Sequence, residues 1–305
     1  MPMTEPILFG ARSTANDVLE GLDLKGRTFL LTGCNSGLGA QTLRALTSHG
    51  GHVIGLARSL EQAREACARA GGSTTPVACD LGDVASVVAA AETVRALGRP
   101  LDAIIANAGV MAPAKLELRY GVEQQFFINH LAHFLLVNRL VDLVPARTGR
   151  IVVVSSDAGV NQAPREGIQF DNLDGHRGYK PLAFYGQSKL ANSLFARELS
   201  RRLADRGILV NSLHPGAVRT SLTRSMGFPF TLIIPVARLF MRSVEQGAAT
   251  QAFLAANPLV DGITGAYWED CKVAQGHPLL EDAAFAQRLW TASEDLLRPH
   301  VGAVG

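Results

Sequence analysis

The stretch Thr28-Phe29-Leu30-Leu31-Thr32-Gly33-Cys34-Asn35-Ser36-Gly37-Leu38-Gly39 joins a short apolar run to a glycine-rich turn. An apolar run without polar alternation is typical of a strand in a parallel sheet whose two faces are both covered. The glycines allow a tight turn, and a helix that follows presents its unpaired backbone N–H groups to an anion. The stretch therefore predicts a strand, a phosphate-binding turn and a helix. Its spacing is TGxxxGxG rather than GxGxxG, so a plain structural turn stays open as the alternative.

Short β-rich runs alternate with helical stretches along the rest of the chain. We expect strands at residues 28–32, 53–57, 76–79, 102–106, 150–155, 208–212 and 266–268. We expect helices at residues 39–48, 60–70, 84–97, 120–143, 183–203 and 244–256. This alternation predicts an α/β fold with one doubly wound parallel sheet, a Rossmann-type domain with helices on both faces. Ligands of such a sheet bind outside the carboxyl ends of its strands.

The bulk composition is that of a globular protein. The 305 residues are 47% hydrophobic and 18% charged, and the formal net charge of +2 gives no argument for a nucleic-acid or anionic-membrane partner. No apolar run reaches the length of about 20 residues that spans a bilayer, and residues 1–23 lack the apolar segment of a signal peptide. Cys34, Cys67, Cys79 and Cys271 have neither disulfide-framework nor zinc-site spacing, so we expect a reducing, cytoplasmic location.

Polar residues follow several of the predicted strands. Arg58 comes after the second strand, where an acidic residue would hold a ribose 2′-hydroxyl and an arginine accommodates a 2′-phosphate, so it favours NADP(H), with NAD(H) still possible. A solvated arginine is the alternative. Asp80 follows the third strand and either accepts a hydrogen bond from an adenine amino group or caps the next helix. The small, polar turn at residues 107–109 follows the fourth strand.

Tyr185 and Lys189 lie four residues apart in the predicted helix 183–203, so they share one face. A cation beside the phenol favours phenolate and would bring the pKa of Tyr185 from about 10 toward neutrality. Such a tyrosine can donate or accept a proton. Pairs of this kind also occur by chance, so this one gains its meaning only from the rest of the chain.

Five motifs appear in the order in which the short-chain dehydrogenase/reductase family carries them, and through them the chain resembles that family. They are TGxxxGxG at residues 32–39, the turn at 107–109, the serine pair 155–156, YxxxK at 185–189 and Pro215-Gly216, and they cover about residues 25–271. Residues 125–136, 170–173, 185–192 and 265–271 resemble the retinol-dehydrogenase-like branch, which includes the WW-domain-containing oxidoreductase and the light-dependent protochlorophyllide reductases. The chain shows no WW domain and no N-terminal membrane anchor, so the resemblance does not imply retinol as the substrate.

The resemblance assigns catalytic roles to four residues. It implies that Ser156 donates a hydrogen bond to the substrate oxygen, and that Tyr185 protonates an alkoxide or removes an alcohol proton. It implies that Lys189 lowers the pKa of Tyr185 and holds the nicotinamide ribose, and that Asn129 holds a water in the proton relay. By itself, Asn129 is equally well explained as a buried helix asparagine satisfied by local hydrogen bonds.

The expected cofactor-binding residues come from the turns at the strand ends together with the catalytic pair. They are Gly33, Asn35, Ser36, Gly37, Leu38, Gly39, Arg58, Asp80, Leu81, Asn107, Ala108, Gly109, Tyr185, Lys189, Pro215, Gly216, Val218 and Thr220. No metal is expected. His130 and His133 lie three apart without an accompanying carboxylate or cysteine, so we interpret them as packed or surface histidines.

The segment at about residues 221–243 is apolar and resembles the substrate lid of the family, which favours a bulky lipophilic substrate. Core filling, a subunit contact and shallow contact with a membrane stay open as alternatives. We expect an N-terminal arm at residues 1–25, the main domain at 26–271 and a C-terminal extension at 272–305 packed on or near that domain.

The main functional hypothesis is an NADP(H)-dependent oxidoreductase that interconverts an alcohol and a ketone or aldehyde on a small lipophilic molecule. The alternative is a catalytically silent nucleotide-binding sensor or scaffold, because a fold alone does not establish function. Chemistry on a nucleotide sugar is disfavoured, since the 34 residues after Cys271 are too few for a larger substrate domain. The resemblance also implies a homodimer or homotetramer, associated through the helices that contain Asn129 and Tyr185.

Overall fold

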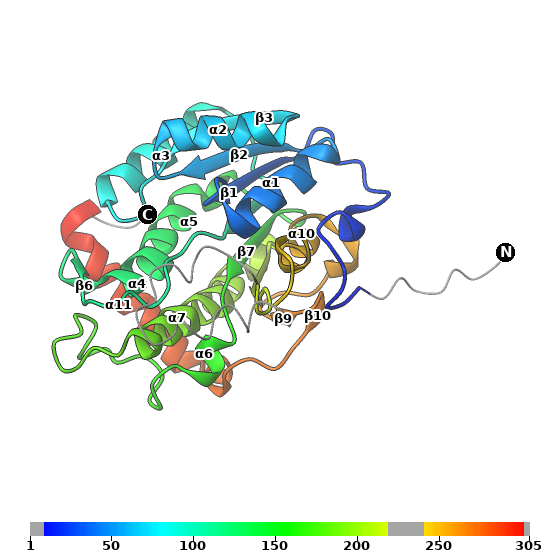
Figure 1. Ribbon diagram of the computed structural model, residues 1–305. Helices are drawn as coiled ribbons and strands as arrows, with labels where there is room; N and C mark the ends of the chain where they lie inside the picture. The colour runs from blue at the N-terminus through cyan, green and yellow to red at the C-terminus, as the bar shows by residue number, and fades with distance from the viewer. Residues whose placement is uncertain (1–8, 219–240, 302–305) are drawn as a thin grey trace.

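The computed structural model describes residues 9–218 and 241–301. Its centre is an eight-stranded sheet with the order β10-β9-β8-β7-β4-β1-β2-β3. Neighbouring strands pair in parallel, apart from the antiparallel pair of β9 and β10 at one edge. Figure 1 shows helices on both sides of this sheet. The expected doubly wound α/β fold is therefore confirmed.

Seven strands of this sheet agree with the expected ones to within three residues at each end. They are β1 (Thr28–Thr32), β2 (His52–Ala57), β3 (Ser73–Ala78), β4 (Ala103–Ala106), β7 (Arg150–Val154), β8 (Leu209–His214) and β9 (Tyr267–Glu269). The edge strand β10 (Lys272–Val273) was not expected. All five residues of β1 are buried, as a strand covered on both faces requires.

The longer helices are α1 (Gly37–Ser48), α2 (Leu60–Ala70), α3 (Val84–Ala96), α5 (Ala132–Leu140), α7 (Pro181–Arg202), α10 (Ala249–Ala256) and α11 (Ala283–Val301). The expected helix 244–256 is divided at Ala248 into α9 (Val244–Gly247) and α10. Short helices include α6 (Ala158–Asn161) and the 3-10 turn η1 (Asp17–Leu19). No helix among the described residues is both long enough and apolar enough to cross a bilayer.

The expected continuous helix at residues 120–143 is wrong. Strands β5 (Leu118–Arg119) and β6 (Val122–Glu123) form a hairpin there, followed by α4 (Gln124–Phe126), a π-helical turn η2 (Phe127–Leu131), α5 and η3 (Val141–Leu143). Tyr120 and Gly121 both have positive φ, the conformation that a two-residue hairpin turn requires and that a helix excludes. The apolar residues between 120 and 143 nevertheless have helical spacing, because most of the segment after Glu123 is helical.

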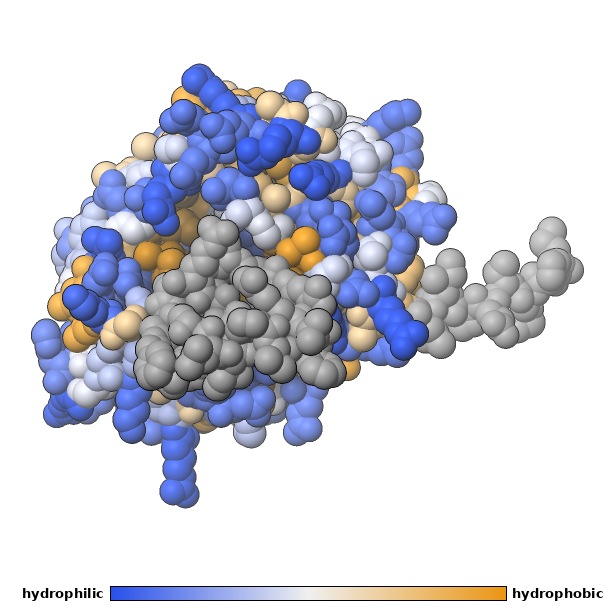
Figure 2. Space-filling view, in the orientation of Figure 1, coloured by the Kyte–Doolittle hydropathy of each residue, from blue (hydrophilic) through white to orange (hydrophobic). Residues whose placement is uncertain are grey.

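Two apolar clusters fill the space on the two sides of the sheet. Leu30 belongs to the cluster formed with α3, α5, α7 and α11, whereas its neighbours Phe29 and Leu31 belong to the cluster formed with α1, α10 and η1. This alternation follows from the period of two along a strand. Figure 2 shows one face of the molecule as mainly hydrophilic with separate apolar spots.

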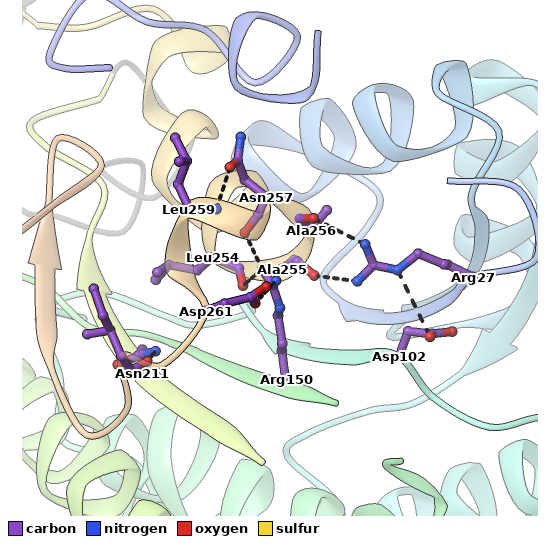
Figure 3. A network of polar contacts seen from close by, with 11 residues as sticks. Arg27, Asp102, Arg150, Asn211, Leu254, Ala255, Ala256, Asn257, Leu259 and Asp261 are labelled. Carbon is purple, nitrogen blue, oxygen red and sulfur yellow. Dashed lines mark hydrogen bonds and ion pairs between the residues drawn. The ribbon is translucent and has the colours of Figure 1, made fainter. Parts of the chain in front are cut away.

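Two arginines hold the C-terminal end of α10 against the amino ends of the strands (Figure 3). Arg27 donates to the carbonyl oxygens of Ala255 and Ala256 at 3.3 and 3.1 Å. Arg150, which is 5% exposed, donates to the carbonyl of Asn257 at 2.7 Å and to the carboxylate of Asp261 at 2.7 Å. These cations satisfy carbonyls that a helix end leaves unpaired and complement its dipole.

The described parts of the N-terminal arm and of the C-terminal extension both pack on the domain. In the N-terminal arm, Val18 and Leu19 are fully buried, and the carbonyl of Val18 accepts a hydrogen bond from Asn257 at 2.7 Å. At the other end, Trp290 of α11 packs against Phe134 of α5 and Phe195 of α7, with ring centroids 4.8 and 5.8 Å apart. The C-terminal extension therefore covers one side of α5 and α7, and its helix was not expected from the sequence.

Candidate active site

A cavity of about 830 Å³ opens at the carboxyl ends of β1, β2, β3, β4, β7 and β8. It spans the boundary between β1 and β4, where the strand order reverses and where doubly wound sheets bind their ligands. The structure brings most of the predicted site residues together on its wall. They are Gly33, Asn35, Ser36, Gly37, Leu38, Gly39, Arg58, Asp80, Leu81, Asn107, Ala108, Gly109, Ser156, Tyr185, Lys189, Pro215, Gly216 and Val218. Asn129 is fully buried behind the wall, and Thr220 lies outside the described residues.

The glycine-rich turn between β1 and α1 is packed too closely for side chains. Gly33 has a φ of +69°, and a Cβ at Gly39 would lie 2.0 Å from the carbonyl oxygen of Gly33. Ser36, the residue before α1, makes no side-chain capping bond, so the first N–H groups of the helix face the cavity without an internal side-chain partner. This geometry suits a diphosphate.

Arg58 lies at the carboxyl end of β2, and its exposed side chain borders the cavity. Within the described part of the chain it makes no ion pair, so its charge is available to a ligand. Asp80 also lines the cavity, and its carboxylate accepts a hydrogen bond from the backbone N–H of Gly82 at 2.8 Å. The alternative that Asp80 caps the next helix is wrong, because Asp83 occupies the N-cap of α3.

The turn after β4 is tied to the last residue of β1. Thr32 Oγ1 accepts hydrogen bonds from the backbone N–H groups of Asn107 at 2.9 Å and Ala108 at 3.0 Å. The side-chain amide of Asn107 donates to the carbonyl of Thr32 at 2.8 Å. The two cofactor-facing turns therefore form one unit, and the side chain of Asn107 holds that unit together.

Ser156 and Tyr185 both line the cavity. Ser156 Oγ donates to the carboxylate of Asp157 at 3.1 Å and accepts from the N–H of Ala158 at 3.2 Å. Its interaction with the phenol of Tyr185 by itself lowers the pKa of that phenol. Ser155 turns away, as expected for its neighbour, and donates to the carbonyl of Lys189 at 2.6 Å.

The expected lowering of the pKa of Tyr185 by Lys189 is not what the structure shows. Burial raises the pKa of Tyr185 to about 12, and the interaction with Ser156 only partly offsets this. Burial also lowers the pKa of Lys189 to about 8. The ammonium lies 5.8 Å from the centroid of the Tyr185 ring and donates to the carbonyl of Val154 at 3.1 Å, so it is held beside the ring. The pairing on one helix face is as expected, but burial outweighs the charge.

Asn129 lies in the π-helical turn η2 and contacts the catalytic helix from behind. Its amide forms a reciprocal pair with the backbone of Val110, at 2.8 and 3.0 Å, and donates to Ser188 Oγ at 2.9 Å. The side chain is thus satisfied by partners distant in the sequence, and not by the local hydrogen bonds of the structural alternative. The backbone carbonyl of Asn129 accepts a hydrogen bond from His133 Nδ1 at 2.9 Å, within a π turn of the kind that is frequent at functional sites.

His130 and His133 are both 1% exposed and lie in the interior. His130 contacts Ser293 of α11, and His133 contacts Thr32 and Asn129. No cluster of three metal-binding side chains is found in residues 9–218 and 241–301. The four cysteines are buried and unpaired.

His214 also lies on the wall, and the sequence indicates that it supports the loop after its strand rather than acting in catalysis. It ends β8, and its Nε2 lies 3.8 Å from the carboxylate of Asp157, which the sequence did not single out. Further apolar wall residues that were not assigned to the site are Val110, Met111, Pro113, Ile128, Leu182 and Met241. Ile128 lies within the motif stretch 125–136 and Met241 within the expected lid, whereas the others lie next to motifs but are marked by none. The expected lid lies outside the described residues, apart from residues 241–243.

Comparison with known proteins agrees with this geometry. The family model described as short chain dehydrogenase matches residues 27–169 and 171–227. Human retinol dehydrogenase 14 is 38% identical over 295 residues, covering 89% of this chain and 86% of that protein. The human WW domain-containing oxidoreductase is 33% identical over 305 residues, covering 96% of this chain and 73% of that protein.

Among solved structures, an uncharacterised protein of Mycobacterium paratuberculosis has a TM-score of 0.75 at 29% identity, covering 92% of this chain and 97% of that one. The fold, the order of the motifs and these likenesses agree with one another. The chain therefore belongs to the short-chain dehydrogenase/reductase family of oxidoreductases, in its retinol-dehydrogenase-like branch.

Proposed function

We propose that this enzyme is an NADP(H)-dependent oxidoreductase that interconverts an alcohol and a ketone or aldehyde on a bulky lipophilic substrate. The observation that carries the proposal is the meeting of Ser156, Tyr185 and Lys189 at one end of a cavity whose other end is the glycine-rich turn. A cavity of about 830 Å³ is large enough for a nucleotide and a substrate side by side.

The bound nicotinamide supplies or accepts the hydride, and the chain's own residues bind, orient and move the proton. Ser156 and Tyr185 both line the cavity and interact with each other, so a substrate oxygen bound beside them would contact both hydroxyls. In the reductive direction Tyr185 donates its proton to that oxygen. A pKa of about 12 keeps the phenol protonated at neutral pH, which suits this role.

Two features of the wall support the finer assignments. Arg58 is exposed at the end of β2 with no ion-pair partner within the described residues, which supports recognition of a 2′-phosphate. The wall residues Val110, Met111, Ile128, Leu182 and Met241 supply apolar surface beside Tyr185, which supports a lipophilic substrate.

Assembly and location follow from other features. The resemblance implies that subunits associate through α5 and α7. One side of both helices is already covered by α11 of the same chain. We therefore favour a monomer over the dimer or tetramer.

The four buried, unpaired cysteines support a reducing compartment such as the cytoplasm.

The test is to follow NADPH oxidation by the purified protein against a panel of hydrophobic ketones and aldehydes, and then to repeat it with NADH. We expect turnover of at least one apolar carbonyl, faster with NADPH. The Tyr185→Phe variant is expected to lose at least about a hundredfold in rate, the usual contribution of a positioned proton donor. Faster turnover with NADH would contradict the NADP assignment, and a fully active phenylalanine variant would contradict the mechanism.

A further inference from the structure

His133 is a buried histidine of α5 that the proposed chemistry does not use. Its Nε2 lies 2.9 Å from Thr32 Oγ1, and its Nδ1 lies 2.9 Å from the backbone oxygen of Asn129. Both contacts are buried, and the ring is 1% exposed. One side chain thus links the end of β1 to the π turn that contains Asn129.

The partners of Thr32 fix where the proton of this ring lies. Thr32 Oγ1 accepts two backbone N–H groups, those of Asn107 and Ala108, which occupy both of its lone pairs. Its own hydrogen must therefore point to His133 Nε2, which then carries no proton. Burial lowers the pKa of His133 to about 4, so the ring is neutral at physiological pH and bears its single proton on Nδ1. That proton is donated to the carbonyl of Asn129.

The line of hydrogen bonds continues from Asn129 into the catalytic helix. The amide of Asn129 donates to Ser188 Oγ at 2.9 Å, and Ser188 Oγ donates to the carbonyl of Tyr185 at 2.8 Å. A Cβ at Gly109 would lie 2.9 Å from the Asn129 amide oxygen and 3.5 Å from Lys189 Nζ, so these groups lie close together behind the turn.

We propose that His133 is a positioning residue of the active site, which fixes the carbonyl of Asn129 relative to the two cofactor-facing turns. The inference rests on the proposed function only in that the cavity binds a nicotinamide dinucleotide. The two ring nitrogens of His133 contact different parts of this hydrogen-bonded network. Nε2 supports Thr32 and the turn after β4, and Nδ1 supports Asn129 and the proton-transfer side.

His130 provides a matched control on the same stretch of helix. It is equally buried, and its Nε2 lies 2.9 Å from Ser293 Oγ of α11, on the side away from the cavity. Ser293 Oγ itself donates to the carbonyl of Leu289 at 2.8 Å, so His130 Nε2 is the donor in this contact. Substitutions of His130 therefore cost packing and one buried hydrogen bond without touching the line through His133.

The test compares His133→Asn and His133→Gln with His130→Asn and His130→Gln. An asparagine amide nitrogen takes the place of Nδ1, so His133→Asn keeps the bond to Asn129 and leaves the Thr32 hydroxyl without its acceptor. A glutamine oxygen takes the place of Nε2, so His133→Gln keeps the bond to Thr32 and loses the bond to Asn129. Loss of one buried hydrogen bond corresponds to about a tenfold effect.

We expect His133→Asn to raise the dissociation constant for NADPH about tenfold, with kcat within about twofold of the wild type. We expect His133→Gln to lower kcat about tenfold, with the dissociation constant within about twofold. The His130 variants are expected to lower Tm about as much as the His133 variants do. They should leave the dissociation constant for NADPH and kcat unchanged. Nitrogen-15 chemical shifts of the His133 ring in the wild-type protein should show the proton on Nδ1.

The proposal is overturned by a proton on Nε2, or by His133 variants whose affinity and kcat change no more than those of the His130 variants. The outcome is separable from the proposed function. Nucleotide affinity is measured with both NADPH and NADH and needs no substrate, and the ring spectrum needs neither. A wild-type protein that binds nucleotide but turns over no carbonyl would contradict the proposed reaction. The role of His133 would then be decided by nucleotide affinity and by the ring spectrum.

Discussion

Lys189 holds an ammonium group in the protein interior, where its side chain is 4% exposed. Burial lowers its folded-state pKa from 10.5 to about 8, so between these values the unfolded chain binds more protons than the folded one. This group's contribution to stability therefore falls as pH drops from about 10.5 to 8, and the full cost remains at neutral pH. The folded protein would therefore be more stable with an uncharged side chain at position 189.

The Lys189→Met variant is accordingly expected to be inactive and more stable than the wild type at pH 7, by about 1–3 kcal/mol. Thermal unfolding at pH 7 and at pH 10 measures this, and the gain should be smaller at pH 10. Lys180→Met, at an exposed position just before α7, serves as the control and is expected to change stability by less than about 0.5 kcal/mol. Equal stability of the methionine variant and the wild type at pH 7 would contradict the prediction.

The same two groups predict the pH dependence of carbonyl reduction. Tyr185, with a pKa of about 12, stays protonated through the working range, whereas Lys189 loses its charge above about pH 8. We expect kcat/KM for reduction to fall as pH rises through about 8. In an active Lys189→Arg variant the cation persists, so this fall should disappear. A wild-type profile that stays level to pH 10 would show that the charge of Lys189 is not needed.

At the scale of single elements, the end of α10 depends on Arg150 (Figure 3). Arg150→Met removes the donor for the carbonyls of Leu254 and Asn257, and should lower the free energy of unfolding by about 3–5 kcal/mol. Chemical denaturation measures the loss. Asp261→Asn leaves those two contacts in place and changes only the exposed end of the ion pair, so it should cost about 1 kcal/mol or less. Similar losses in both variants would assign the stability to the ion pair instead.

The elements differ in how far the sequence predicts them. Strands such as β1 and helices such as α2 carry their boundaries locally, in glycines and in a serine N-cap like Ser59. The hairpin before α4 was missed because Tyr120 adopts a positive φ that its residue type does not announce. The π turn at Asn129 was missed because it depends on the contacts of that side chain with Val110 and Ser188 across the fold.

The residues of the candidate site likewise differ in whether local sequence is enough to predict them. Residues in glycine-rich or paired motifs were predicted because each motif is contiguous in sequence. Asp157 and His214 come from the ends of two strands and meet only after folding, at 3.8 Å. The pKa of Tyr185 was predicted in the wrong direction because burial depends on the whole surroundings, while the sequence shows only the spacing to Lys189.

At the scale of the whole molecule, α11 takes up surface on α5 and α7 that would otherwise be open to another subunit. We predict that the full chain is a monomer in solution, which light scattering coupled to size-exclusion chromatography measures. Trp290→Ala should lower stability by about 3–5 kcal/mol, as expected for loss of a large buried aromatic side chain. A mass of two or four chains would mean that association uses other surfaces or displaces α11.

The packing of the N-terminal arm shows that the folding unit begins before the region matched by the family model. The match to the family begins at residue 27, yet Ala15, Val18, Leu19 and Leu24 are already part of the buried interior beneath α10. Asn257 and the backbone carbonyl of Glu245 both bond to this arm. A fragment cut at the family boundary would keep every motif of the active site and still expose apolar surface along α10. The bounds of the family model are therefore a poor guide to where this protein can be shortened.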